Sequence, residues 1–169
     1  MVELFTEVDE NNNVIGLRPI KDFQSGKYIH RSAHLLLFNS KGEVLIHKRS
    51  PNKIWSPNLY TFSVAGTVGD ESYEDCIKHE IPEELGIKIP VKLLFIYKFF
   101  IPKDKSFHAL FIGKSDKKIK PDPDEISEIK WVSLKWLRKD ISDNPEEYTL
   151  PFLAGMKKYF EKFKNLYLI

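Results

Sequence analysis

The sequence predicts an α+β fold or a sandwich built on a mixed β-sheet. Segments with strand and helix patterns follow one another without a regular strand–helix–strand rhythm, which favours this class over a purely parallel sheet. The chain has 169 residues, and 42% of them are hydrophobic. That content is enough for one well-filled core and too little for two. We therefore expect a single domain over residues 1–169, without internal repeats.

Apolar runs separated by turn residues predict antiparallel strand pairs in the first third of the chain. The pairs are Leu4–Val8 with Val14–Leu17, and His34–Phe38 with Val44–Lys48. A loop rich in Pro and Asn, Ser50–Asn58, then leads to a strand expected over Tyr60–Ala65.

The second half of the chain predicts further strands and two helices. Two long apolar runs have strong strand character, a polar loop and a last strand follow, and the final helix is amphipathic. In order, these elements are Val91–Ile101, His108–Gly113, the loop Ser115–Asp124, the strand Ile129–Val132, and helices over Leu134–Asp140 and about Pro151–Phe163.

A further helix, over about residues 72–84, carries the most informative pattern. Ser72 can cap its N-terminus, with Asp75 three residues later, and Gly86 follows the last turn as a stop signal. Pro82 lies inside this helix. Because proline lacks the N–H that would pair one turn back, we expect it to distort the helix.

Three carboxylates of this helix, Glu80, Glu83 and Glu84, are spaced at i, i+3 and i+4 and therefore share one side. A solvated helix face is the ordinary explanation of such a cluster. However, at about 100° per residue Glu80 and Glu84 fall within the apolar arc of the helix, where a carboxylate is costly unless a cation meets it. We therefore predict that the three carboxylates bind a hard divalent cation, Mg²⁺ or Mn²⁺.

Composition excludes several other functions. The chain has 26 Lys and Arg against 24 Asp and Glu, so bulk electrostatic binding of nucleic acid is not expected. A single Cys excludes an intrachain disulfide and suits a reducing compartment. The acidic N-terminus lacks an apolar leader segment, and no apolar run approaches 18 residues. We expect a cytoplasmic protein without a membrane partner.

The carboxylate helix resembles the Nudix box, the signature of the Nudix superfamily, with the pattern G-x5-E-x7-R-E-U-x-E-E-x-G-U, where U is aliphatic. From Glu71 onward the chain matches seven of the eight fixed positions: Glu71, Glu80, Ile81, Glu83, Glu84, Gly86 and Ile87. The segment before the box and the segment around Trp131 also resemble the branch that contains isopentenyl-diphosphate isomerases and hydrolases similar to them.

This resemblance implies a Nudix-type α/β/α sandwich around a mixed β-sheet. It also implies a Mg²⁺-dependent hydrolase that cleaves the diphosphate linkage of a nucleoside diphosphate derivative. The metal ligands implied are the carboxylates of Glu80, Glu83 and Glu84 and the carbonyl of Gly66. The same three Glu residues would be catalytic, and the partner would be a small nucleotide or diphosphate substrate.

Two departures from the box weaken the implied activity. Only four residues separate Gly66 from Glu71, where the family has five. The family's Arg is His79 here, and a neutral His cannot reproduce the bidentate pair that Arg forms with a carboxylate. We expect His79 to support Glu71 only weakly. A nucleotide-binding Nudix module with little turnover is therefore an alternative.

The isomerase is the second alternative. The isomerases of this branch carry a catalytic Cys where Ala65 stands and a metal-binding His where Thr67 stands. Cys76 does not replace that thiol, because its helix position favours packing in the core. The loss of the proton-transfer thiol favours hydrolysis.

Other residues give weaker signals. Glu125 and Glu128 precede the last strand, where many family members place a further acidic residue, and Lys48 and Arg49 could neutralise substrate phosphates. His34 and His47, on strands, favour structural roles. The sequence predicts neither the leaving group nor the oligomeric state.

Overall fold

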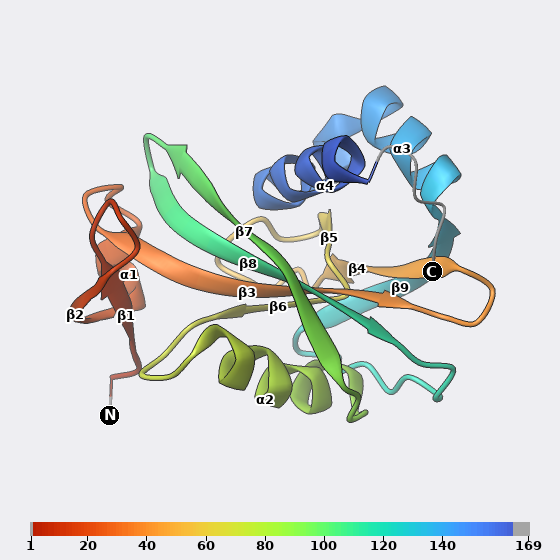
Figure 1. Ribbon diagram of the computed structural model, residues 1–169, viewed down its shortest axis with the longest axis horizontal. Helices are drawn as coiled ribbons and strands as arrows, with labels where there is room; N and C mark the ends of the chain where they lie inside the picture. The colour runs from red at the N-terminus through yellow and green to blue at the C-terminus, as the bar shows by residue number, and fades with distance from the viewer. Residues whose placement is uncertain (1, 164–169) are drawn as a thin grey trace.

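The computed structural model describes residues 2–163, which form nine strands, four α-helices and a short 3₁₀ helix (Figure 1). In chain order these elements are β1 (Leu4–Val8), β2 (Val14–Pro19), α1 (Ile20–Phe23), β3 (Ile29–Phe38), β4 (Glu43–Arg49), β5 (Tyr60–Thr61), β6 (Val64–Thr67), α2 (Tyr73–Leu85), β7 (Val91–Ile101), β8 (Asp104–Lys114), β9 (Ile126–Ser133), α3 (Leu134–Asp143), the 3₁₀ helix Pro145–Glu147 and α4 (Leu150–Lys162).

The sheet is mixed and is organised around β3. This strand pairs in parallel with β8 and antiparallel with β1 and β6. β4 meets β3 only at the Phe38–Val44 pair and then diverges to pair with β5 and β9. The sheet therefore splits into two parts beyond that pair, which leaves room between them for a site.

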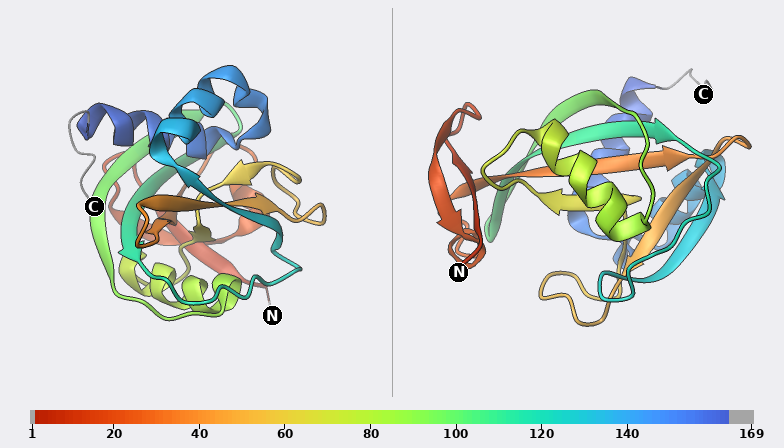
Figure 2. Two further views of the ribbon diagram at one scale, coloured as in Figure 1. Left: turned by 90° about the vertical axis from the view of Figure 1, so that its right-hand side faces the viewer. Right: turned by 90° about the horizontal axis from the view of Figure 1, so that it is seen from below.

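Helices cover both faces of this sheet, as Figures 1 and 2 show, with α2 on one side and α3 and α4 on the other. Side chains of β3 alternate between the two layers because successive residues of a strand point to opposite faces. Leu35 and Leu37 pack in the cluster that contains α2, whereas Leu36 and Phe38 pack in the cluster that contains α4. The predicted α/β/α sandwich is confirmed.

The predicted strand at residues 60–65 is wrong in one respect, since two short strands replace it. β5 pairs with β4, whereas β6 pairs with β3, so the chain crosses between the two parts of the sheet. Ser63 ties this crossing together. Its hydroxyl donates to the Leu45 carbonyl (2.6 Å) and accepts from the Leu37 amide (2.8 Å), which joins the two diverging strands.

The predicted helices agree with the structure to within three residues at each end. Ser72 caps α2 by accepting from the Asp75 amide, and Gly86 ends it in the left-handed conformation at φ 66°. Pro82 does not interrupt the helix, which continues to Leu85. α1 and the 3₁₀ helix were not predicted, because elements of three or four residues leave no periodic pattern. Within residues 2–163, no helix is long and apolar enough to cross a membrane.

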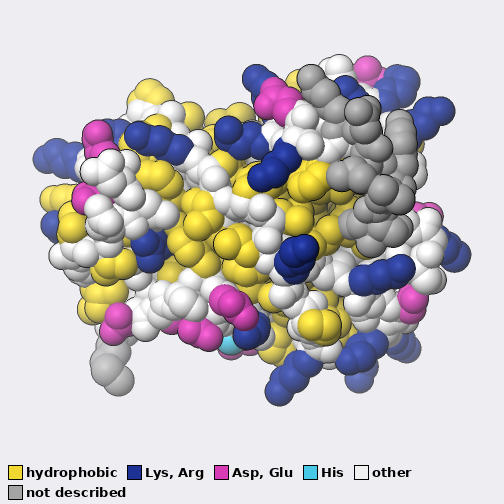
Figure 3. All heavy atoms as spheres, in the orientation of Figure 1, with side chains coloured by type: hydrophobic (Ala, Val, Ile, Leu, Met, Phe, Trp, Pro, Cys, Tyr) yellow, Lys and Arg dark blue, Asp and Glu magenta, His cyan; other side chains and the backbone are white. Residues whose placement is uncertain are grey.

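β7 forms an edge of the sheet, and apolar side chains gather along it on the face shown in Figure 3. Leu93 and Ile96 are both more than two-fifths exposed. A register shift between Leu93 and Phe95 and the charges of Lys92 and Lys98 interrupt this edge. Bulges and lysines are common devices against edge-to-edge association of strands.

Candidate active site

A cavity of about 1070 Å³ opens where the two parts of the sheet diverge. The carboxylates of α2 line one wall, and polar side chains of β3 and β8 line another. The loop between β4 and β5 and the segment before β9 complete it.

Glu84 is the most buried carboxylate of α2, at 4% exposure. Its Oε2 atom finds no hydrogen-bond partner among the described residues. His47 Nδ1 is 4.0 Å away, but burial lowers the pKa of this imidazole to about 4, so that it carries no charge near neutral pH. Burial raises the pKa of Glu84 well above its usual value, and the charges of Glu80 and Glu125 raise it further. A buried unpaired acceptor of this kind is costly without a proton or a cation.

Glu80 lies one turn earlier and faces the same cavity. Burial raises its pKa to about 7, with Glu83 adding repulsion and His79 opposing the shift. Gly66 of β6 lies directly against this side chain, because a Cβ atom at Gly66 would be only 2.5 Å from Glu80 Cγ. Only glycine therefore fits at position 66 without moving Glu80.

His79 bridges the two carboxylates that flank it. Its Nδ1 atom lies 3.0 Å from Glu71 Oε2, and its Nε2 atom lies 3.7 Å from Glu80 Oε1. The shortened segment between Gly66 and Glu71 has therefore not moved Glu71 out of reach of the residue at the Arg position of the box.

The structure separates the weaker sequence candidates into two groups. Arg49 and Glu125 line the cavity, and Lys53 joins them through an ion pair with Glu125 at 2.5 Å. Lys48 and Glu128 do not line it. Lys48 Nζ lies 5.2 Å from the centre of the Tyr60 ring, and Glu128 pairs with Lys130 at 3.3 Å.

The α2 carboxylates fit a hard divalent cation. Carboxylate oxygens are the ligands that Mg²⁺ prefers, and the unpaired Oε2 of Glu84 marks a position where a cation would replace a missing partner. Another group of donors, Glu71, Cys76 and His79, lies within 4.8 Å. It fits less well, because burial raises the pKa of the Cys76 thiol far above its usual value and keeps it protonated.

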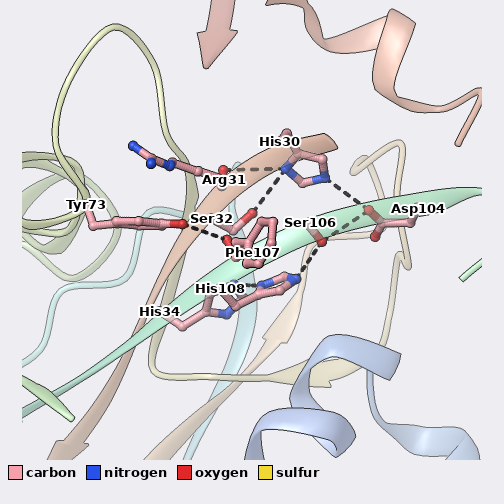
Figure 4. Close-up of polar contacts among 9 residues, drawn as sticks. All are labelled: His30, Arg31, Ser32, His34, Tyr73, Asp104, Ser106, Phe107 and His108. Atoms are coloured by element: carbon pink, nitrogen blue, oxygen red, sulfur yellow. Dashed lines mark hydrogen bonds and ion pairs between the residues drawn. The ribbon is translucent and has the colours of Figure 1, made fainter. Parts of the chain in front are cut away.

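A hydrogen-bonded chain of polar side chains crosses the opposite wall (Figure 4). His34 Nε2 lies 2.7 Å from His108 Nδ1, and His108 Nε2 lies 2.7 Å from Ser106 Oγ. Ser106 reaches Asp104 at 3.3 Å, and Asp104 reaches His30 Nε2 at 3.0 Å. The sequence analysis missed this series of hydrogen bonds, although polar residues at alternate positions of two apolar strands were a usable signal.

Burial keeps His34 and His108 neutral. It lowers the pKa of His34 to about 3 and that of His108 well below its usual value. Burial alone would raise the pKa of Asp104, but its hydrogen bond with His30 holds it below the usual value. The structural role expected for His34 is thus compatible with the packing, while its place on the cavity wall was not foreseen.

Apolar side chains enclose the rest of the cavity. They come from elements far apart in the chain: Phe23 from α1, Trp55 from the loop after β4, Phe99 and Ile101 from β7, and Leu150 from α4. The cavity therefore combines an acidic wall, the three cationic side chains of Arg49, Lys53 and Lys103, and an apolar surface. This combination suits a ligand with a charged and an apolar end.

Comparisons with known proteins agree with this geometry. A family model described as NUDIX domain matches residues 28–151. A prenyl-diphosphate phosphatase from Methanosarcina mazei is 39% identical over 169 residues, covering 98% of this chain and 99% of that protein. Isopentenyl-diphosphate Delta-isomerase 2 from Photorhabdus laumondii is 34% identical, covering 90% and 89%. A crystal structure of a Deinococcus radiodurans protein matches with a TM-score of 0.80 at 25% identity, covering 92% and 98%.

Proposed function

The chain belongs to the Nudix hydrolase family, and on that premise we propose that it is a Mg²⁺-dependent enzyme that hydrolyses the diphosphate group of a prenyl diphosphate. The observation that carries the proposal is the buried, unpaired carboxylate of Glu84 beside Glu80, on the wall of a cavity that both polar and apolar side chains line. A charged group is retained in such a place when it binds a ligand or takes part in chemistry.

The α2 carboxylates and Arg49 have separate roles in this proposal. Glu80, Glu83 and Glu84, with the Gly66 carbonyl, would hold the metal. When bound, the metal neutralises phosphate charge and makes a water more acidic. Arg49 binds a phosphate oxygen, since a guanidinium forms paired hydrogen bonds with phosphate. Glu83 is the preferred proton acceptor, because Lys53 already holds Glu125.

The organic group of the substrate is proposed from the cavity lining. Phe23, Trp55, Phe99 and Ile101 offer an apolar surface to a hydrocarbon chain, and burying each methylene there contributes about 0.8 kcal/mol. The Methanosarcina relative, named a prenyl-diphosphate phosphatase, supports the same class of substrate. A nucleoside diphosphate derivative is the second candidate, because Trp55 also offers a face on which a base can stack.

Isomerisation is disfavoured by the position of Ala65. It pairs with His34 in the register of β6 and β3 and lines the cavity, so a methyl group stands where the isomerases of this branch have their thiol. Cys76 is fully buried in the cluster beneath α2 and cannot replace that thiol.

Phosphate release from a panel of prenyl diphosphates and nucleoside diphosphate derivatives, with and without Mg²⁺, tests the proposal. We expect Mg²⁺-dependent release from a prenyl diphosphate and no dimethylallyl diphosphate from isopentenyl diphosphate. Isomerisation at a catalytic rate, or release only from nucleotides, would contradict it.

Neighbouring residues of β4 provide a matched pair of variants. Arg49→Ala should raise KM for the diphosphate by at least about tenfold, or 1.4 kcal/mol, because Arg49 lines the cavity. Lys48→Ala should leave KM unchanged, because Lys48 lies over Tyr60, outside the cavity lining. Equal effects of the two substitutions would exclude the specific role of Arg49.

A further inference from the structure

Three aromatic rings form a row along the cavity, from α1 through β3 to the loop after β4. The Phe23 ring meets the His30 ring edge to face, with centroids 5.2 Å apart. The His30 ring in turn lies nearly parallel to the Trp55 indole, with centroids 6.4 Å apart and an angle of 18° between the planes. All three side chains line the cavity.

Contacts at the middle ring and at the Trp55 end hold this row in place. Asp104 lies 3.0 Å from His30 Nε2 and thereby orients the imidazole ring. Arg49 donates from Nε to the Trp55 carbonyl at 3.0 Å, and Lys53, two residues before Trp55, is tied to Glu125. Arg49, which is proposed to bind the diphosphate, therefore also fixes the loop that carries Trp55, together with Lys53.

Trp55 also forms the boundary between the cavity and solvent. Its side chain lines the cavity while the residue is 37% exposed, whereas His30 behind it is 5% exposed. The cavity volume of about 1070 Å³ is at the upper end of small-molecule sites, which span roughly 300–1,000 Å³. Volume alone would thus admit a long hydrocarbon chain, and any limit on chain length must come from the walls.

We infer that Trp55 is a specificity-determining residue that closes the cavity against long chains, so that the organic group of the substrate is a single five-carbon prenyl unit. This inference rests on the proposed function and deepens it. A short chain is covered by the indole, whereas a chain of three prenyl units must displace it.

The variant Trp55→Ala tests the inference. It removes the indole and opens the cavity to solvent at this position, so a longer chain can extend through the gap. We expect the ratio of kcat/KM for farnesyl diphosphate to that for dimethylallyl diphosphate to rise at least about tenfold, or 1.4 kcal/mol. Trp55→Phe should retain most of the wild-type preference.

Two controls separate chain selection from damage to the loop. Trp136→Ala removes another exposed tryptophan, on α3 and away from the cavity lining, and should leave the ratio unchanged. Inhibition by inorganic diphosphate, which has no chain, should be the same in wild type and Trp55→Ala. A uniform loss of activity with every chain length would overturn the inference.

Binding distinguishes failure of this inference from failure of the proposed function. Titration calorimetry measures the dissociation constants of the two prenyl diphosphates, with Ca²⁺ replacing Mg²⁺ to limit turnover. The ratio of these constants then reports chain selection without catalysis. If no substrate is hydrolysed but the binding ratio still shifts in Trp55→Ala, the proposed reaction is wrong and the role of Trp55 stands. Equal affinity of the wild type for both chain lengths overturns the role of Trp55.

Discussion

The two polar walls of the cavity differ in how their buried groups are satisfied. On the β3–β8 wall, His108 has partners at both ring nitrogens, and the unpaired Nδ1 of His34 belongs to a neutral ring packed edge to face with Phe62. On the α2 wall, by contrast, Glu84 keeps an unpaired carboxylate oxygen and is surrounded by further acids.

This difference shows which wall requires a ligand. A neutral imidazole without one hydrogen bond costs about 1–3 kcal/mol, which a fold can absorb. A buried ionised carboxylate costs considerably more and is normally paired or bound to a metal. The histidine wall thus needs no ligand, whereas the carboxylate wall has a place for the cation that we propose.

Glu84→Gln gives the largest expected effect, because it removes the unpaired charge while keeping the side-chain shape. Turnover should fall at least about tenfold, equivalent to 1.4 kcal/mol. The metal-free variant should nevertheless be more stable than wild type, by about 2–4 °C in Tm for each kcal/mol regained. Kinetics and melting curves with and without Mg²⁺ check both effects, and unchanged Mg²⁺-dependent activity would contradict the assignment.

Ser106→Ala tests the opposite wall. It leaves His108 Nε2 without its partner in a fully buried position and should destabilise the fold by about 1–3 kcal/mol. Ser32→Ala is the matched control, since Ser32 makes only a 3.4 Å contact with His30. In denaturant unfolding, the free energy of unfolding of Ser106→Ala should be well below that of Ser32→Ala. The same loss in both variants would show that the chain of hydrogen bonds contributes little.

The two walls should also respond to pH in opposite directions. His34 has a folded pKa of about 3 against 6.5 when unfolded, so its contribution is complete above pH 6.5 and is lost as pH falls towards 3. Glu80 has a folded pKa of about 7 against 4.5, so its contribution is complete below pH 4.5 and is lost as pH rises through 7. Each group changes stability by at most about 1.4 kcal/mol per pH unit.

A substitution that removes the titrating group of one wall should therefore reveal how the group on the other wall makes stability depend on pH. Glu80→Gln should lose stability on acidification from pH 6.5 to 4.5 more steeply than wild type, whose two slopes offset each other. His34→Phe should show the reverse. Melting temperatures of metal-free wild type, Glu80→Gln and His34→Phe over this pH range measure these slopes. Parallel curves for the three proteins would show that the two walls do not respond to pH in opposite directions.

His79→Arg has the smallest expected effect. Arg can pair with Glu71 through two donors in a fixed fork, whereas His79 contacts Glu71 through one ring nitrogen at 3.0 Å. We therefore expect kcat to rise a few-fold, or roughly 1 kcal/mol. An unchanged kcat would show that position 79 does not limit activity.

The α2 wall could be predicted from the sequence because its information is local. Glu80, Glu83 and Glu84 lie within one helical turn, and the periodicity of one helix places Glu84 on its buried face. The burial of Glu84 follows from that single element, whereas the closeness of Glu71 to His79 does not, because Glu71 lies before α2. The break between β5 and β6 was not predictable, since Ser63 takes its partners from two other strands.

The β3–β8 wall and the aromatic row depend on distant pairings. His34 meets His108 only because β3 and β8 pair in parallel across more than 70 residues, and Trp55 meets His30 through a loop without a periodic pattern. The alternating polar residues of β3 and of β8 are visible in the sequence, but a single sequence carries no local signal for which of them meet. For the same reason Lys48 and Arg49, neighbours on one strand, could not be separated before the structure showed which of them lines the cavity.

The parallel pairing of β3 with β8 also has a consequence for how the chain folds. Ile29 pairs with Lys105 and Phe38 with Lys114, so the central strand cannot find its neighbour until most of the chain is available. Closing so long a loop carries an entropic cost before any contact offsets it, and such topologies fold slowly. During synthesis, the side of β3 that pairs with β8 therefore stays open while the following 65 or so residues emerge, a wait of several seconds at roughly 5–20 residues per second. Its apolar run Leu35–Phe38, fully buried in the native protein, is then the segment most in need of protection from aggregation.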